Sequence, residues 1–390
     1  MNLCALAVFA GALPTVIWGY LLLARGGFWQ VRRSLAPMTG TVEVSRPIAV
    51  IIPARNEESV IAQSIASLLR QTCVQSMHIF LVDDASSDRT AELAEDSARQ
   101  AGGLARFTIL HSRSLPPGWT GKLWAVRQGI EAARDLHPEF LLLTDADIVH
   151  SPTSIPNLVS LAETGRYDLT SFMPMLHCQT LAEKILIPAF VFFFFKLYPP
   201  AWIADPHRAV AGAAGGCMLV RYAALQRIGG IHAICNQIID DCALARTVKC
   251  SGGRLWLGLA PGTSSIRNYG SFSEIGRTIS RTAFSQLHHS IVMLLAALLG
   301  MATTYLLPAV LLFSGRPLLM TFGAATWLMM TVSYIPMVKF YRLHPLWSAL
   351  LPLAALFYMG ATIHSAVRYW SGRGGEWKGR VQDRGGLRSE

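Results

Sequence analysis

Acidic side chains in closely spaced pairs are the residues of this chain best suited to chemistry. Asp145 and Asp147 stand one residue apart, directly after the apolar run Leu141–Leu143. Carboxylate oxygens are the ligands that Mg²⁺ and Mn²⁺ prefer, and these ions bind substrate phosphates at the same time. The pair therefore predicts a divalent-cation site that offsets negative charge on a phosphate group. Short acidic pairs are also common on protein surfaces. The apolar run before this pair favours a metal site over a solvated surface pair.

A second acid pair, Asp240-Asp241, follows Ile238-Ile239 and precedes a helical pattern over Cys242–Arg246. A carboxylate within hydrogen-bond reach of a hydroxyl can act as a general base. Two acids at the start of a helix can equally be caps or solvated charges. Both interpretations stay open at this point.

Glycines gather at Gly212, Gly215 and Gly216, just before the apolar run Cys217–Val220. Glycine lets a backbone come close to a ligand, because it has no Cβ. The alternative is a tight turn that leads into a strand.

The elements that would position these residues alternate between strand and helix. Continuous β-branched or apolar runs predict buried strands, namely Ile48–Ile52, His78–Val82, Phe107–Leu110 and Phe140–Thr144. Helical spacing follows the first, second and third of them, and Asn56 is expected to cap the first helix. This alternation predicts a doubly wound, mostly parallel α/β sheet. Asp83-Asp84 and Asp145 then lie at the carboxyl ends of strands, where such sheets bind ligands.

Long apolar runs at both ends of the chain predict membrane helices. Hydrophobic residues make up 52% of the sequence and charged residues only 15%. A span needs roughly 20 apolar residues, and the runs that qualify are Met1–Ala24, Ser290–Ser314, Pro317–Val338 and Pro345–Val367. We expect an N-terminal anchor over residues 1–24 and about three membrane helices within residues 290–368. For any single run, a buried core helix is the alternative.

Residues 182–204 contain the shorter apolar run Ile185–Phe195, which includes four consecutive phenylalanines. It is too short to cross a bilayer. An interfacial helix and a core helix explain it equally well.

Basic residues indicate the orientation in the membrane. Residues 25–46 carry arginines directly after the first run, so the following domain is expected in the cytoplasm. The first run lacks a basic start and a cleavage site, which favours an anchor over a signal peptide. Four spans would put the C-terminus outside, yet residues 368–390 hold six Lys or Arg against three acids. One of the last three runs is therefore expected to lie in the membrane plane or to turn back.

The net charge of +10 suits an anionic lipid surface or a polyanionic substrate. No basic helix or aromatic-interleaved stripe indicates nucleic acid. The seven cysteines include no CxxC pair, which favours reduced thiols and disfavours a zinc site at Cys235, Cys242 and Cys250. The oligomeric state cannot be predicted.

Four motifs in order resemble those of the family 2 inverting glycosyltransferases. They are Val50–Glu57, Val82–Asp88, Asp145–Asp147 and Asp240-Asp241. The resemblance runs from about Pro47 to Arg281. Two further segments, Leu115–Lys122 and Arg281–Leu287, resemble the hopene-associated subgroup found in hopanoid-making bacteria.

This resemblance implies a GT-A fold over residues 47–289, followed by the membrane helices and a basic tail at 369–390. It implies an inverting hexosyltransferase of the bacterial inner membrane, with its catalytic domain in the cytoplasm. The donor would be a nucleotide-diphosphate sugar, expected to be a UDP-sugar, and the acceptor a lipid or hopanoid-type hydroxyl. The cofactor would be Mg²⁺ or Mn²⁺.

The resemblance also assigns site residues. They are Pro53, Arg55, Glu57, Asp83, Asp84, Lys122 and Asp145 for the donor, Asp145 and Asp147 for the metal, Gly215, Gly216 and Cys217 on the acceptor side, and Asp240, Asp241 and Arg281 for catalysis. The family's base is the second residue of a Glu-Asp pair, so Asp241 takes that role here. Many membrane-bound relatives carry QxxRW, whereas this chain has Arg277–Thr282 without the Trp. Arg281 can still face the diphosphate, and the departure favours a single transfer over processive synthesis.

Two other classes of function fit the same acids. A metal-dependent nucleotidyltransferase normally needs an early glycine-rich phosphate loop, which Pro53–Asn56 lacks, and it would release pyrophosphate rather than a nucleoside diphosphate. A non-catalytic nucleotide-sugar-binding membrane scaffold would bind the donor without turnover. A transporter is disfavoured, because the predicted spans hold little ionisable beyond His364.

Overall fold

The computed structural model describes residues 3–31, 44–72 and 74–375. Within them, one sheet of eight strands has the order β3-β2-β1-β4-β7-β6-β8-β5. The strands are β1 (Ile48–Ala54), β2 (Met77–Asp83), β3 (Phe107–His111), β4 (Phe140–Thr144), β5 (Ile148–His150), β6 (Leu169–Met175), β7 (Cys217–Arg221) and β8 (Leu255–Ser265).

The first half of the sheet, β3-β2-β1-β4, is entirely parallel. β7 then runs antiparallel to both β4 and β6, and β6 pairs in parallel with β8. All seven residues of β1 are buried, as expected for a central parallel strand covered on both faces. The expected α/β sheet is confirmed, and so are the four strands expected from the sequence, each to within two residues. The sheet was expected to be mostly parallel, whereas antiparallel pairings of β7 and β5 make its second half mixed.

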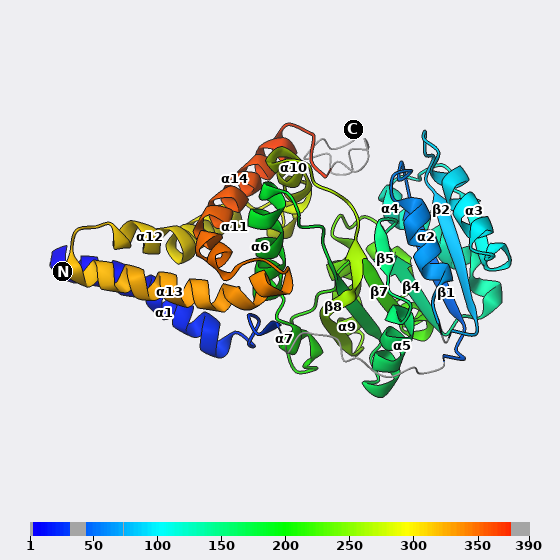
Figure 1. Cartoon of the computed structure of the whole chain (residues 1–390), viewed down its shortest axis with the longest axis horizontal. Coiled ribbons are helices and arrows are strands. Elements are labelled where there is room, and N and C mark those ends of the chain that lie inside the picture. Colours follow the sequence, from blue (N-terminus) through cyan, green and yellow to red (C-terminus); the bar gives the residue numbers. More distant parts are fainter. Residues whose placement is uncertain (1–2, 32–43, 73, 376–390) are drawn as a thin grey trace.

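Helices cover the two faces of this sheet (Figure 1). They are α2 (Ile61–Leu69), α3 (Thr90–Gln100), α4 (Gly121–Ala132), α5 (Ser154–Thr164), α8 (Tyr222–Arg227) and α9 (Asp240–Cys250), with short 3₁₀ turns η2 (Leu104–Arg106), η3 (Arg134–Leu136), η4 (Ile231–Ile234) and η5 (Ser285–Leu287). The expected cap at Asn56 is wrong, because α2 begins five residues later, after Val60. Asn56 instead has a left-handed backbone (φ 53°), and its side-chain oxygen accepts a hydrogen bond from the Ser87 amide at 2.8 Å.

Three helices connect the sheet with the apolar end of the molecule: α6 (Leu181–Leu197), α7 (Pro200–Ala204) and α10 (Phe272–Thr282). Thr180 and Glu183 form a reciprocal cap at the start of α6. Much of the apolar surface of α6 is buried, including Leu186, Phe192 and Phe195. It packs against both α13 and α14, which favours the core-helix interpretation of this run.

The remaining helices are α1 (Leu3–Ala24), α11 (Ile291–Met301), the π-helical turn η6 (Ala302–Leu306), α12 (Leu307–Leu312), α13 (Pro317–Phe340), the 3₁₀ turn η7 (Pro345–Leu350) and α14 (Leu351–Trp370). Within the part of the chain that the structure describes, three segments are long and apolar enough to cross a bilayer: Ile291–Leu312, Pro317–Phe340 and Pro345–Trp370. A shorter apolar stretch, Gly11–Ala24, belongs to α1. Most of the predicted basic linker and tail, at residues 32–43 and 376–390, lies outside the described residues.

Candidate active site

The polar site lies where three parallel strands end. Ala54 of β1 pairs in register with Asp83 of β2, and β4 ends on the other side of β1. A cleft of about 270 Å³ opens at this edge of the sheet. Its polar lining consists of Glu57, Thr120, Lys122, Asp145, Asp147, Gln237, Asp240, Arg267, Tyr269, Thr278 and Arg281. The expected carboxyl-end location of the acids is thus observed.

The Asp145–Asp147 motif forms the turn between β4 and β5. The Ile148 amide donates to the Asp145 carbonyl oxygen at 3.3 Å, which reverses the chain after β4. Because Ile148 pairs with Ser265 of β8, Asp147 is carried against that strand, and its Oδ2 accepts the Ser265 hydroxyl at 2.7 Å. Asp145 stays in the cleft, with 37% of its side chain exposed.

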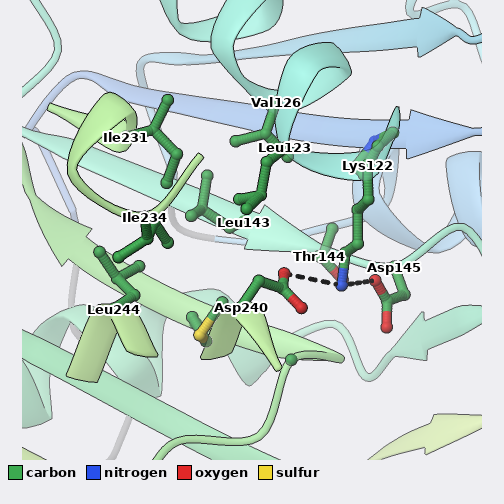
Figure 2. A pocket seen from close by; sticks show the side chains of 13 residues that line it. Lys122, Leu123, Val126, Leu143, Thr144, Asp145, Ile231, Ile234, Asp240 and Leu244 are labelled. Carbon is green, nitrogen blue, oxygen red and sulfur yellow. Dashed lines mark ion pairs between the residues drawn. The ribbon is translucent and has the colours of Figure 1, made fainter. Parts of the chain in front are cut away.

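Lys122 connects the two acid pairs (Figure 2). The Thr120 hydroxyl accepts the Leu123 amide and so caps α4, which places Lys122 in the first turn of the helix. Its Nζ lies 2.9 Å from Asp145 Oδ1 and 3.1 Å from Asp240 Oδ2. Burial opposes its charge, but attraction to Asp145 and Asp240 outweighs burial and raises the pKa of Lys122. Two carboxylates that are 95 positions apart in the chain, Asp145 and Asp240, therefore meet at one ammonium group.

Arg267 is a second, half-buried cation of the cleft, and it was not predicted from the sequence. It follows the end of β8, and its Nη2 lies 2.7 and 2.8 Å from the two oxygens of Glu57. Its Nε lies 3.2 Å from Asp147 Oδ2. Burial disfavours its charge, but Asp147 and Glu57 together raise the pKa of Arg267. A single arginine in a polar stretch carries no spacing signal, so only the fold reveals this contact.

The two acids at the start of α9 have different surroundings. Asp240 lines the cleft and holds Lys122. Asp241 does not belong to the cleft lining; its oxygens accept the backbone amides of Gly215 at 2.9 Å and Cys242 at 2.7 Å. Burial, followed by the negative charge of Asp240, raises the pKa of Asp241 to about 6.

The glycines before β7 act through close packing. A Cβ on Gly215 would lie 3.2 Å from Asp241 Oδ2 and 3.5 Å from Lys122 Nζ. On Gly216 it would lie 2.8 Å from Pro174. Cys217 is fully buried within β7 and does not line the cleft, which differs from the acceptor-side expectation, because its side chain packs into the sheet.

The loops after β1 and β2 are joined by hydrogen bonds. Arg55 donates to the Asp84 carbonyl oxygen, and the Glu57 amide donates to the Thr90 hydroxyl at 2.7 Å. Asp83 and Asp84 are buried, and Asp83 Oδ1 accepts the Ser86 amide at 3.2 Å. Pro53 and Glu57 line the cleft, whereas Arg55, Asp83 and Asp84 do not.

Arg281 lies on α10 and lines the cleft. Among the described residues it has no carboxylate within ion-pair distance, unlike Lys122 and Arg267. It is therefore the cleft cation that remains available for an anionic ligand.

The carboxylates fit a divalent cation held jointly with a ligand. The described residues contain no group of three or more His, Cys, Asp or Glu that could enclose a metal ion. Mg²⁺ is commonly held by one or two carboxylates together with substrate phosphates and water. Asp145 binds Lys122 through Oδ1, and Asp147 binds Ser265 and Arg267 through Oδ2. Within the described part of the chain, each aspartate thus retains a second oxygen without a protein partner.

Comparison with known proteins agrees with this geometry. Residues 49–229 match the family model described as "Glycosyl transferase family 2". This segment, somewhat less than half of the chain, is similar to family 2 glycosyltransferase domains. The match covers β1 to α8 and includes Lys122 and the Asp145–Asp147 turn, whereas Asp240 and Arg267 lie beyond it.

Curated relatives match over the same region. An "Undecaprenyl-phosphate 4-deoxy-4-formamido-L-arabinose transferase" of Pseudomonas aeruginosa (strain LESB58) is 34% identical over 128 residues, which is 31% of this chain and 34% of the relative. The "Uncharacterized glycosyltransferase EpsJ" of Bacillus subtilis (strain 168) is 34% identical over 123 residues, or 31% and 32% of the two chains. The chain thus spans about a third of the length of these relatives.

A solved structure confirms the GT-A type of fold. The mannosyltransferase PcManGT from Pyrobaculum calidifontis, in complex with GDP-Man and Mn²⁺, superposes with a TM-score of 0.55. The alignment covers 93% of this chain and 98% of that chain at 17% identity. The similarity therefore extends beyond the glycosyltransferase domain to the helices that follow it.

Proposed function

We propose that this protein is a membrane-bound inverting glycosyltransferase. It moves one sugar from a nucleotide-diphosphate donor, a UDP-sugar in the first instance, to the hydroxyl of a lipid such as a hopanoid. The observation that carries the proposal is the cleft itself, where Asp145, Asp240 and Lys122 meet beside the unpaired Arg281. The family 2 domain at residues 49–229 supports the same reaction class.

The donor occupies the edge formed by β1, β2 and β4. Pro53 and Glu57 lie nearest the nucleoside, and Lys122 and Arg281 approach the diphosphate from α4 and α10. A divalent cation held by Asp145 and Asp147 would, when bound, stabilise the negative charge of the leaving nucleoside diphosphate. Lys122 and Arg281 add fixed positive charge at the same place. They lower the barrier to sugar transfer, because their N–H groups are already oriented before the reaction.

Asp241, the neighbour of the cleft-lining Asp240, accepts the proton of the acceptor hydroxyl, which requires one of its oxygens to turn from its backbone amide towards the cleft. Its raised pKa of about 6 makes it a stronger base than an ordinary aspartate while leaving it ionised at neutral pH. Gly215 holds its Oδ2 in place, and Asp240 keeps Lys122 beside it. The hydroxyl oxygen then attacks the anomeric carbon, and the bond to the diphosphate breaks with inversion.

A lipid phosphate is the second candidate acceptor, and the name of the Pseudomonas aeruginosa relative favours it. A phosphate oxygen is already anionic near neutral pH, so its attack needs no general base. The two acceptors therefore differ in their need for Asp241. Asp241→Asn should stop transfer to a hydroxyl and leave transfer to a phosphate much less affected.

The decisive experiment is turnover by the purified full-length chain with a panel of nucleotide sugars and Mg²⁺ or Mn²⁺. Neutral hydroxylated lipids, including hopanoids, are compared with a polyprenyl phosphate. We expect a glycolipid and free nucleoside diphosphate, and loss of both when EDTA is added. Release of pyrophosphate would indicate a nucleotidyltransferase, and tight donor binding without any product would indicate a scaffold.

A further inference from the structure

Helix α14 does not follow the direction of the other long apolar helices. α13 and α1 run side by side, with the hydroxyls of Thr15 and Thr326 2.8 Å apart, and α12 also packs on α13. α14 instead runs steeply across this group, towards the side where α10 lies (Figure 1). It packs mainly against α10, and to a lesser and equal extent against α6 and the turn η6.

The chain enters α14 by turning back along α13. Trp327 Nε1 donates a hydrogen bond to the carbonyl oxygen of Ala349, in η7, at 3.2 Å. Trp327 precedes Phe340, the last residue of α13, by 13 residues, which is roughly 20 Å of helix. The segment after α13 therefore returns well into the depth that α13 has just crossed.

The other end of α14 lies beside the start of α11. Tyr369 stacks on His289 with ring centroids 4.1 Å apart, and Phe284 contacts Trp370 at 5.5 Å. The Ser365 hydroxyl accepts the Phe284 amide at 3.0 Å. Residues 284–289 directly precede α11 and follow α10, so α14 ends on the side of the catalytic cleft.

The two faces of α14 have different surroundings. Leu353, Leu356, Ile363, Val367 and Trp370 form a stripe at helical spacing, and each is between 46% and 55% exposed. The opposite face is buried on the protein, where the Tyr358 hydroxyl donates to the Leu186 carbonyl oxygen of α6 at 3.0 Å. α11, which packs on α14, also has exposed apolar side chains, including Val292 and Leu299.

We infer that residues 343–370 form a re-entrant segment, which enters and leaves the bilayer on the side of the catalytic domain, and that lipid acyl chains cover the stripe of α14. Both ends of the segment are basic, with Arg342 before it and Arg368 and Arg373 at its end, as expected for two ends on the cytoplasmic side. Only α1, α11–α12 and α13 then cross the membrane. The N-terminus and the turn at Ser314 face outward, and the C-terminus shares the compartment of the catalytic cleft.

This arrangement has a consequence for the cleft. α14 supports α10, with Phe272 and Phe357 in ring contact at 5.9 Å, and α10 carries Arg281. The end of α14 that leaves the membrane lies near the bilayer surface. Through its contact with α10, α14 therefore holds the cleft at that surface, where a lipid head group lies.

Cysteine labelling of the full-length protein in intact cells tests the inference. The parent chain has every cysteine except the buried Cys217 and Cys242 replaced by serine. Ser314→Cys reports the turn between α12 and α13, Ser371→Cys reports the end of α14, and Ser114→Cys reports the exposed loop beside the cleft. A membrane-impermeant maleimide is applied before and after permeabilisation.

We expect position 314 to react in intact cells, and positions 114 and 371 to react only after permeabilisation. The re-entrant segment requires positions 314 and 371 to lie on opposite sides. If both react from the same side, α14 crosses the membrane and the inference is overturned. If the cysteines at positions 371 and 114 are labelled from different sides, the conclusion that the tail and the cleft share a compartment is overturned as well.

Discussion

At the scale of single residues, the cleft is built from carboxylates that share two cations. Lys122 joins Asp145 to Asp240, and Arg267 joins Glu57 to Asp147. Each bridge fixes a carboxylate from one part of the chain against a carboxylate from another. Charged hydrogen bonds of this kind are worth about 1.5–3 kcal/mol each, so removing one partner should move the groups that remain.

Asp241 and Asp240 should respond differently to neutral substitution. Asp241→Asn removes the proposed base, and turnover with a hydroxyl acceptor should fall by about 10²–10⁴ while donor affinity stays nearly unchanged. Asp240→Asn removes one partner of Lys122, so its main effect should be on donor affinity. Steady-state kinetics and calorimetric titration of the nucleoside diphosphate separate the two effects. Wild-type turnover by Asp241→Asn would show that the base lies elsewhere.

The pH dependence of turnover should report Asp241. A base works only when it is deprotonated, and burial with the charge of Asp240 raises the pKa of Asp241 to about 6. Turnover of a hydroxyl acceptor should therefore be full above pH 7 and fall as the pH drops through about 6. The residual activity of Asp241→Asn should lack this limb. A limb that persists in that variant would assign the titration to another group.

At the scale of elements, α10 stands between the sheet and the apolar helices. Its cap at Ser271 and its packing on α14 fix the direction of the helix, so that Arg281 lines the cleft and Arg277 is exposed. The same helix thus provides both a test residue and its control.

Arg281→Gln should lower kcat/KM at least tenfold. The reason is that a charged hydrogen bond to the diphosphate is worth about 1.5–3 kcal/mol, and 1.4 kcal/mol corresponds to a factor of ten. Arg277→Gln removes the same charge from the same helix but not from the cleft, so it should stay within about twofold. The kcat/KM of both variants is measured at a saturating acceptor concentration. Equal losses of kcat/KM would show that the overall charge of α10, and not Arg281 itself, is responsible.

The parallel half of the sheet was predictable, because its strands depend on local pattern, whereas β5, β6 and β8 were not predicted. β1, β2, β3 and β4 begin and end within two residues of the apolar runs that predicted them. The start of α2 was not predictable, because the Asn56 side chain accepts a hydrogen bond from the loop after β2 instead of capping a helix. Arg267 was not predictable either, since its partner Glu57 is 210 residues away and no local pattern marks such a pair. The acids could be identified, whereas the division of roles between Asp240 and Asp241 depends on the fold.

At the scale of the whole molecule, the catalytic and apolar parts share one core. Side chains of the sheet such as Leu141 belong to the same buried cluster as Phe192 of α6 and Tyr334 of α13. Phe192 and Tyr334 are in ring contact at 5.0 Å. The boundary predicted at residue 289 therefore passes through a continuous hydrophobic interior.

A fragment of residues 47–289 should consequently fail as an independent domain. Without α13 and α14, the outer face of α6 would expose a large apolar patch, and such patches promote association. We expect the fragment to aggregate or to require detergent, whereas the full-length chain in detergent is monodisperse. Size-exclusion chromatography of the two proteins tests this. A monodisperse, donor-binding fragment in plain buffer would contradict a shared core.

The two ion pairs of Lys122 affect which anions the empty cleft can bind. In the empty cleft, Lys122 is already neutralised on two sides, and Arg267 is equally occupied. Inorganic phosphate without a metal ion would meet a cluster of negative side chains, with Arg281 as the cleft cation that has no carboxylate partner among the described residues. Only an anion that arrives together with its own divalent ion brings enough charge to loosen those pairs. The empty cleft is therefore expected to hold metal-free phosphate more weakly than a nucleotide that carries Mg²⁺ or Mn²⁺.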